Sequence, residues 1–533
     1  MKPNNLLDNT LLGMPTDPAG QVPRQQLLAA IEKRINDHQN TSVGSKTDAL
    51  IDDFVQDLQA KQSQVLQTVD TPQASDDVHF LNRLTYGSNP SFRIELENSG
   101  WQAMLEQQLD YQSIDTSFLE NSLAADLPTL GMTPLDILTE IRAGNLEIFV
   151  QVIQELIVST VARQIFSPAQ LYERMVEFWS DHFNMNVLDD PLFLFKTADD
   201  RDNIRPNAMG KFKDLLRANA SSTAMLFYLD NYSNTKEGPN ENYARELLEL
   251  HTLGVDGGYT EADIVEVARA FTGWTIHPGT LEFMFYMPYH DRRKKNVLGV
   301  QLKRTYNGGI TDGEQVIDLL AAHPSTARFI STKLARRFVG DTPPAELIDE
   351  LTQVFLDTEG DTKELLRTIF YSPAFWESRE QKMKRPIDFL NSLLRRIGFN
   401  PGEDLFRVLF FRLDQLGQIP FFWHAPDGYP DTADYWTNTA ALISRWSSGN
   451  NISQFIPPQI MDSMLAGANT PNSIIQSMAV GLIDRKLGKD ERRKLKRKIF
   501  TGQLPNQPVD GDPVEYAQIV ATVLLGSRYF QMR

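Results

Sequence analysis

The chain has 533 residues, of which 41% are hydrophobic and 10% aromatic, enough apolar side chains to build a packed core. Its formal net charge of -17 argues against a general nucleic-acid-binding protein, because such proteins need a basic surface to neutralise phosphates. The sequence contains no cysteine, which excludes disulfide bonds, thiolate catalysis and thiolate metal ligands.

Residues 1 to 75 are predicted to form a polar helical extension. Prolines punctuate its start, and two amphipathic helices are expected over Arg24–Asp37 and Thr47–Val69. The segment from Met1 to Gln21 has no apolar run of signal-peptide length, so no secretory signal is expected and a cytoplasmic location is favoured. No run of about 18 apolar residues occurs in the sequence, so no membrane span is predicted.

Residues 76 to 533 are predicted to form one large helical body, with a sub-boundary near residue 310. Apolar periodicity predicts a core helix over Leu146–Phe166, whose apolar surface nearly encircles it. A further helix is expected to begin at Pro168 and to carry His182 inside a broad apolar face, with Asp181 and other carboxylates on the reverse.

A second helix with the same arrangement is predicted from Asn240 to His251. Leucines form its apolar arc and His251 falls in their middle, while Arg245 and Glu249 have the i, i+4 spacing of an ion pair. An imidazole among leucines must find a hydrogen-bond partner or stay neutral at a cost. The two histidines, His182 and His251, are therefore predicted to meet in space and to mark any site.

Few strands are expected. Leu281–Met287 is predicted to form a short hairpin with Val297–Leu302, and the basic turn between them contains His290 and Asp291. The segment Gly417–Asp434 is dense in proline, glycine and aromatic residues, and a long irregular loop in a compact domain is often functional. The expected fold class is therefore mainly α: a large multi-helix globular body with one short β-hairpin.

Several motifs make the chain resemble the large bacterial family known as domain of unknown function 1800. The resemblance covers roughly residues 76 to 533. The motifs that carry it are His79–Gly87, Glu177–Phe183, Asn240–Asp263, Phe271–Trp274, His290-Asp291 with Leu298-Gly299, His323–Ala327, Lys384–Pro386 and Tyr529–Arg533. Where the family usually has a glycine after His290-Asp291, this chain has Arg293.

This resemblance implies no activity for the chain. Members of the family are typically encoded beside sulfatase-like proteins of domain of unknown function 1501, which makes such a protein the implied partner. Many members also carry export signals, so the resemblance implies an envelope location as the alternative to a cytoplasmic one.

Metal and cofactor chemistry finds little support in the motifs. The three histidines His182, His251 and His290 could converge with carboxylates as a nitrogen and oxygen site. However, the sequence has no HExxH or paired ExxH spacing, and a histidine on an apolar helix face is more often a core residue, so no metal ligand is assigned. Phosphate-binding glycine motifs are also absent from the sequence, which leaves the cofactor unknown.

Acid–base catalysis and ligand binding remain open alternatives. The carboxylates of the two histidine helices could supply a general acid and base if two of them faced one cleft, although charged helix faces are usually solvated. Asparagine and arginine beside the aromatic loop would suit a carbohydrate or peptide ligand, although helix-packing hydrogen bonds explain them equally well.

The sequence therefore predicts a cleft where the His182 and His251 helices meet, flanked by the His290 turn. The favoured function is an enzyme or accessory binding factor that acts on a polymer or protein substrate; the alternative is a non-catalytic partner of a sulfatase-like protein. The predicted catalytic residues are His182, His251 and Glu246, and the predicted binding residues are Asp181, Asn240, Asn242, Arg245, His290 and Asp291.

Overall fold

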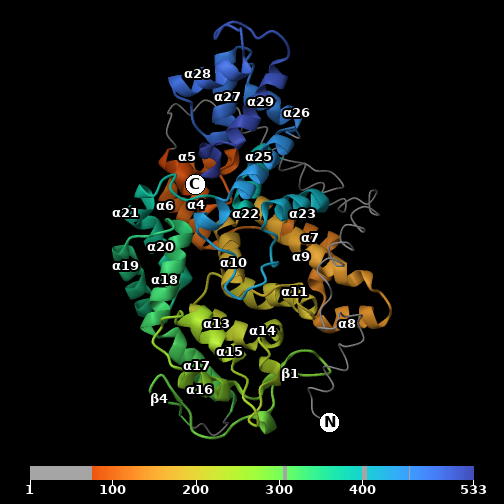
Figure 1. Cartoon of the computed structure of the whole chain (residues 1–533), viewed down its shortest axis with the longest axis vertical. Helices are drawn as coiled ribbons and strands as arrows, with labels where there is room; N and C mark the ends of the chain where they lie inside the picture. The colour runs from red at the N-terminus through yellow and green to blue at the C-terminus, as the bar shows by residue number, and fades with distance from the viewer. Residues whose placement is uncertain (1–74, 304–308, 399–404, 455) are drawn as a thin grey trace.

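The fold is mainly helical, as predicted, and the computed structural model describes residues 75–303, 309–398, 405–454 and 456–533 (Figure 1). The predicted extension, including the helices expected over Arg24–Asp37 and Thr47–Val69, lies outside the described residues. Figure 1 shows an elongated molecule. The C-terminal helices lie at one end, and the helices between residues 212 and 321, with the strands, lie at the other.

The first group of helices runs from the start of the described chain to α9. They are α4 (Asp76–Leu84), α5 (Pro90–Ser99), α6 (Trp101–Leu109), α7 (Ser117–Asp126), α8 (Pro134–Arg142) and α9 (Glu147–Phe166). Their starts follow standard capping chemistry: Ser75 caps α4, Asn89 caps α5, and Thr133 with Asp136 forms a capping box for α8.

Helix α9 confirms the core helix predicted from the sequence. Among the described residues, α9 is the single helix that is long and apolar enough to cross a membrane, and the mean hydropathy of its most apolar window is 1.3. That window is 78% buried inside the protein, because α7, α8, α10 (Gln170–His182), α22 (Pro386–Ile397) and α23 (Leu405–Leu416) pack around the helix. Burial on all sides is what a core helix requires, so α9 gives no clear membrane span.

The middle of the chain builds the region that contains both histidine motifs. Its helices are α10 (Gln170–His182), α11 (Lys196–Asp199), α12 (Arg205–Asn207), α13 (Phe212–Ser221), α14 (Thr223–Tyr228), α15 (Asn242–Glu246), α16 (Glu261–Phe271), α17 (Ile310–Ala321), α18 (Pro324–Phe338), α19 (Ala345–Thr358), α20 (Thr362–Tyr371), α21 (Pro373–Glu377) and α22 (Pro386–Ile397). Helix α18 packs on α19 and α20, and α10 packs on α9.

The strands pair differently from the prediction. Phe283–Phe285 (β2) lies in the predicted strand, but it pairs antiparallel with β1 (Trp274–Ile276), not with the segment near Val297. That segment forms a separate two-residue pair, β3 (Asn296–Val297) with β4 (Val300–Gln301). All three residues of β1 are buried, so the strand lacks the alternation of apolar and polar residues that predicts a strand from sequence. Pairing with β2 satisfies the backbone of this buried strand.

The last third of the chain packs as a helical cluster on α22. Its helices are α23 (Leu405–Leu416), α24 (Ala433–Trp436), α25 (Thr439–Ser453), α26 (Pro458–Leu465), α27 (Pro471–Ile483), α28 (Lys489–Ile499), α29 (Pro513–Leu525) and α30 (Arg528–Gln531). The closing residues return to the body, where Met383 bridges to Met532. The sub-boundary near residue 310 stays a prediction.

Candidate functional site

A cavity of about 340 Å³ opens beside the C-terminal end of α10. Helix α18 and the loop from Asp427 to Thr432 form its other walls, so segments far apart in the sequence meet there. Its charged and imidazole lining consists of Asp181, His182, Lys333, Arg336, Arg337, Arg385, Asp427 and Asp431. A concave surface with convergent polar groups is the ordinary form of a ligand site.

His182, the last residue of α10, has both ring nitrogens engaged. Its Nε2–H donates to the carbonyl oxygen of His251 at 3.0 Å, and its Nδ1 accepts from Nζ of Lys333 at 2.9 Å. These two contacts define the neutral tautomer that carries the proton on Nε2. Burial, with the charge of Lys333 adding to it, holds the pKa of His182 well below its ordinary value.

His251 lies in a π-helical turn rather than in the continuous α-helix expected from the sequence. Helix α15 ends at Glu246, and Leu247–Thr252 (η6) continues with bonds of wider spacing, such as Leu253 N–H to the Leu248 carbonyl at 2.9 Å. The His251 ring is fully buried, and burial lowers its pKa to about 3. Such turns often occur at functional sites.

The meeting of the two histidines confirms that part of the prediction. Their ring centroids lie 6.3 Å apart, and Phe183 packs 5.1 Å from the ring of His251. Both ring nitrogens of His251 are buried without a hydrogen-bond partner among the described residues. His251 therefore meets the site through its backbone carbonyl, while its ring fills the apolar layer behind His182.

Lys333, on α18, faces the cavity, and no carboxylate is bonded to its ammonium group among the described residues. Its Nζ contacts His182 and lies 5.5 Å from the ring centroid of Phe329. Burial lowers the pKa of Lys333 to about 8, although the more distant Asp181 and other carboxylates oppose the shift. Its neighbour Arg336 donates to the carbonyl of Asp341 at 3.3 Å.

A buried ion-pair network forms the floor of the cavity. Glu177, with 9% of its side chain exposed, accepts from both Arg337 and Arg385. Arg385 also donates to Asp181 at 2.6 Å, and Arg337 lies 3.3 Å from Asp431. Because each guanidinium bridges carboxylates from different segments, the network joins α10, α18, the start of α22 and the loop.

Asp181 lies at the edge of this network, with 23% of its side chain exposed. Burial raises the pKa of Asp181 above its ordinary value, and Glu177 adds to the rise, whereas Arg385 opposes it. Directly above it, Gly428 has φ +76° and crosses the Asp181 carbonyl so closely that an added Cβ would lie 2.0 Å from that oxygen. Only glycine fits such a crossing.

The loop that covers the site is anchored to the segment just after α10. Nδ2 of Asn184 donates to the carbonyls of Trp423 and Ala425 at 2.8 and 2.7 Å. The Trp423 indole in turn donates to Asp427 at 2.8 Å and orients that carboxylate at the cavity. The long irregular loop predicted from the sequence is thus held in one conformation by side chains and carbonyls.

Glu246 does not line the cavity, but the charge of Asp427, which does line it, acts on the Glu246 carboxyl group. Burial raises its pKa, Glu249 and Asp427 add to the rise, and Arg245 opposes it. Arg245 makes the predicted pair with Glu249 at 3.6 Å, but its closest partner is Glu261, which it grips with two bonds of 2.8 and 3.0 Å. Arg245 does not line the cavity.

The two predicted asparagines lie at the start of α15, away from the cavity lining. Oδ1 of Asn240 accepts from the backbone N–H of Asn242 at 3.0 Å, and the Asn240 N–H donates to Asn234 at 2.9 Å. These contacts are local turn chemistry that sets the helix entry.

His290 and Asp291 form a separate cluster, and neither lines the cavity that the turn was expected to flank. Nδ1 of His290 bonds the Thr272 carbonyl at 2.8 Å, and Nε2 lies 3.3 Å from Asp312. Although burial acts to raise it, the pKa of Asp291 is held well below its ordinary value by hydrogen bonds from Arg293 and Arg269. Arg293, the departure from the family pattern, therefore supplies a partner for Asp291.

The three histidines considered as metal ligands do not form one cluster, and within the described parts of the chain no group of three or more His, Asp or Glu side chains could hold a metal ion. The residues that sequence reasoning missed are Lys333, Arg336, Arg337, Arg385 and Asp431. A signal for Arg385 was present in the Lys384–Pro386 motif, and α18 carries three cations at i, i+3 and i+4 spacing, which place them on one face.

The region of the chain that a known family matches contains every residue that lines the cavity. No curated protein and no solved structure matches the chain. From residue 79 to residue 532 it matches the family described as protein of unknown function (DUF1800), and the chain belongs to that family.

Proposed function

We propose that the cavity beside His182 is the working site of an enzyme or binding factor, and that it takes an anionic group of a polymer substrate. The observation that carries the proposal is Lys333, a half-buried lysine whose ammonium group faces the cavity with His182 as its bonded partner. Desolvating a cation without a carboxylate beside it costs free energy, and a bound anion would recover that cost.

The neighbouring groups support this role. Arg336 lines the same cavity and makes its side-chain hydrogen bond to a backbone carbonyl, so its charge is also available to an anion. His182 orients the Lys333 ammonium through Nδ1, and His251 fixes the His182 ring through its carbonyl. In this proposal the histidines are positioning residues, and Lys333 and Arg336 touch the substrate.

An acid–base step is compatible with the same site. Asp181 has a pKa raised by burial, and Lys333 has one lowered to about 8, so both groups can exchange protons near neutral pH. Asp181 is proposed as the proton donor and Lys333 as the group that binds or deprotonates the substrate. Glu246 is proposed to add negative charge near Asp427, at the wall of the cavity that this residue forms.

The rim of the site favours an extended ligand. Asp431 lines the cavity with 19% of its side chain exposed, and the rings of Trp423 and Tyr435, which flank it in the sequence outside the cavity lining, lie 5.6 Å apart. Tyr435 is 46% exposed, so its ring is accessible to a ligand. Aromatic faces beside charged groups suit an anionic polysaccharide or an acidic peptide.

The test compares Lys333→Met with Lys494→Met, a matched change at an exposed lysine of α28. Binding of a sulfated polysaccharide, polygalacturonate and polyglutamate is measured by calorimetry, with neutral dextran as the uncharged comparison. We expect at least one anionic polymer to bind, and Lys333→Met to weaken it about tenfold or more. Equal binding by both variants would disprove the proposal, and release of new chain ends would identify an enzyme.

A second candidate is the non-catalytic partner of a sulfatase-like protein, and an exposed apolar surface favours it. Ile443 and Trp446 on α25 are 56% and 58% exposed, and Ile519 and Val523 on the adjoining α29 are 48% and 42% exposed. Exposed apolar groups on two packed helices are typical of a protein contact. Co-purification that Trp446→Ser removes and Lys333→Met leaves intact would support this candidate.

A further inference from the structure

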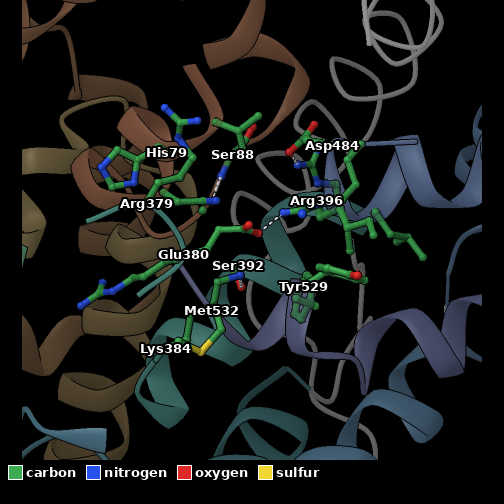
Figure 2. A pocket seen from close by; sticks show the side chains of 18 residues that line it. His79, Ser88, Arg379, Glu380, Lys384, Ser392, Arg396, Asp484, Tyr529 and Met532 are labelled. Carbon is green, nitrogen blue, oxygen red and sulfur yellow. Dashed lines mark hydrogen bonds and ion pairs between the residues drawn. The ribbon is translucent and has the colours of Figure 1, made fainter. Parts of the chain in front are cut away.

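A second pocket, with a different set of lining residues, lies where α4, α22 and the C-terminal residues meet (Figure 2). Five cationic side chains line it, namely Arg379, Lys384, Arg396, Arg485 and Arg533. Two carboxylates, Glu380 and Asp484, line it as well. Because both carboxylates are already bonded to arginines, the pocket presents more positive charge than its own acids neutralise.

Lys384 is the cation of this pocket to which no carboxylate is bonded within the described residues. Its side chain is almost completely buried, and Nζ donates to the hydroxyl of Ser392 at 3.0 Å, as Figure 2 shows. The ammonium also lies 4.1 Å from the ring centroid of Phe530. Burial, with the charge of Arg396 adding to it, lowers the pKa of Lys384 to about 7. The positive charge of Lys384 therefore lacks a nearby negative charge that would offset its burial.

The other groups around Lys384 are donors that lack acceptors. Arg396 follows Ser392 by one helical turn, and its Nη1 is buried without a partner among the described residues. The hydroxyl of Ser88 is likewise buried without a partner among them. Ser88 is brought there by Gly87, whose φ of +122° lets the backbone approach Ser392 so closely that an added Cβ would lie 2.5 Å from the serine Cβ.

We propose that this pocket is a binding site for a small oxyanion such as phosphate or sulfate, held by Lys384, Arg396 and the Ser88 hydroxyl. The cavity of about 30 Å³ has room for a small ion or the head group of a larger monoester. Lys384 and Arg396 are cationic donors that cannot accept, and the Ser88 hydroxyl can donate as well, so an oxyanion accepts from all three and also balances their charge.

The position gives the anion a structural consequence. Ser88 follows α4, and Phe530 belongs to α30 at the end of the chain. Lys384 precedes α22, and Arg396 lies in its last turn. An anion bound between them would tie the C-terminal helices to the body through charge. Its occupancy would therefore raise the thermal stability of the whole described structure.

The test measures Tm for the full chain in a chloride-free buffer with phosphate, sulfate or chloride added to roughly 5 mM, low enough to limit general salting-out effects. We expect phosphate or sulfate to raise Tm by about 2 °C or more. Lys384→Met should lose more than half of that rise, while Lys494→Met, at an exposed lysine of α28, should keep it. Phenyl phosphate distinguishes a free ion from a monoester head group, since only the latter tolerates the ring.

A rise that is the same in Lys384→Met and the wild type would overturn the proposal, and so would the absence of any rise with all three ions. If Lys384→Met does not fold, Ser88→Ala decides, because it removes one hydroxyl and leaves the charges in place. Calorimetric titration with inorganic phosphate should then show binding about tenfold weaker than in the wild type, and unchanged binding would refute the site.

Discussion

The Nε2–H group of His182 donates to the carbonyl oxygen of His251 at 3.0 Å, and this bond fixes what each histidine is able to do. His182 has no nitrogen left for a substrate, because Lys333 occupies Nδ1. His251 contributes a carbonyl, and its ring lies buried beside Phe183. The two residues therefore support Lys333, and the group that this arrangement leaves facing the cavity is the ammonium group rather than an imidazole.

Replacement by leucine should lower the free energy of unfolding at His182 but not at His251. His251→Leu removes ring nitrogens that have no partner, so we expect its free energy of unfolding to be unchanged or higher. His182→Leu leaves both the Lys333 ammonium and the His251 carbonyl without a partner, which should lower the free energy of unfolding by about 2–4 kcal/mol. Urea denaturation of the two variants measures both effects. Equal losses would show that the tautomer assignment is wrong.

Stability should fall as the pH drops below the ordinary histidine range. The pKa values of His79 and His251 are lowered to about 3, and that of His182 is also well below its ordinary value. Below pH 6.5 the unfolded chain binds protons that the folded protein refuses, so each such histidine costs up to about 1.4 kcal/mol per pH unit, from about 6.5 toward 3.

Asp181 acts in the opposite direction, because a carboxylate whose pKa is raised on folding stabilises the fold as the pH falls toward its ordinary value. Denaturant unfolding between pH 7.5 and about 5, where ordinary carboxylates stay ionised, measures the sum. His251→Leu should reduce the slope by up to about 1.4 kcal/mol per pH unit, since it removes one of the histidines whose pKa is lowered on folding. A slope that His251→Leu leaves unaltered would contradict the assignment.

Gly428 should be far more sensitive to alanine than another glycine of the same loop region. Gly428→Ala places a methyl group against the Asp181 carbonyl, so the loop must move away from the cavity. We expect a loss of about 2–4 kcal/mol and weaker ligand binding. Gly417 has a similar φ of +82° with nothing within 4 Å of an added Cβ, so Gly417→Ala should cost only about 1 kcal/mol. Similar losses in both variants would mean that backbone strain alone decides.

Glu177 should be the most costly carboxylate to neutralise at the floor of the site. Glu177→Gln leaves the Arg337 and Arg385 guanidinium groups short of a charged partner in a buried network, and we expect a loss of about 3–5 kcal/mol. Glu261→Gln breaks a bidentate pair with Arg245 that is largely in solvent, and its thermal unfolding should stay close to that of the wild type. Thermal and urea unfolding of both variants test the contrast.

The sequence by itself determined the fold class, the core helix α9 and the meeting of His182 with His251. Each follows from a local rule: apolar periodicity states which face of a helix is buried, and a histidine on such a face must be accommodated inside the protein. The motifs also identified the family over residues 79 to 532. The pairing of Phe283–Phe285 was predicted wrongly, because strand partners depend on burial that a short window does not reveal.

Only the tertiary structure decided which charged groups face the cavity. Lys333 and Arg385 stand 151 and 203 positions after His182, and the spacing of residues does not show that they meet it in space. The Lys384–Pro386 motif marked Lys384 and Arg385, but only the fold shows that the first lines the second pocket and the second lines the cavity. A charge acquires its function from the dielectric and the partners around it, and these are set by segments that meet only when the chain is folded.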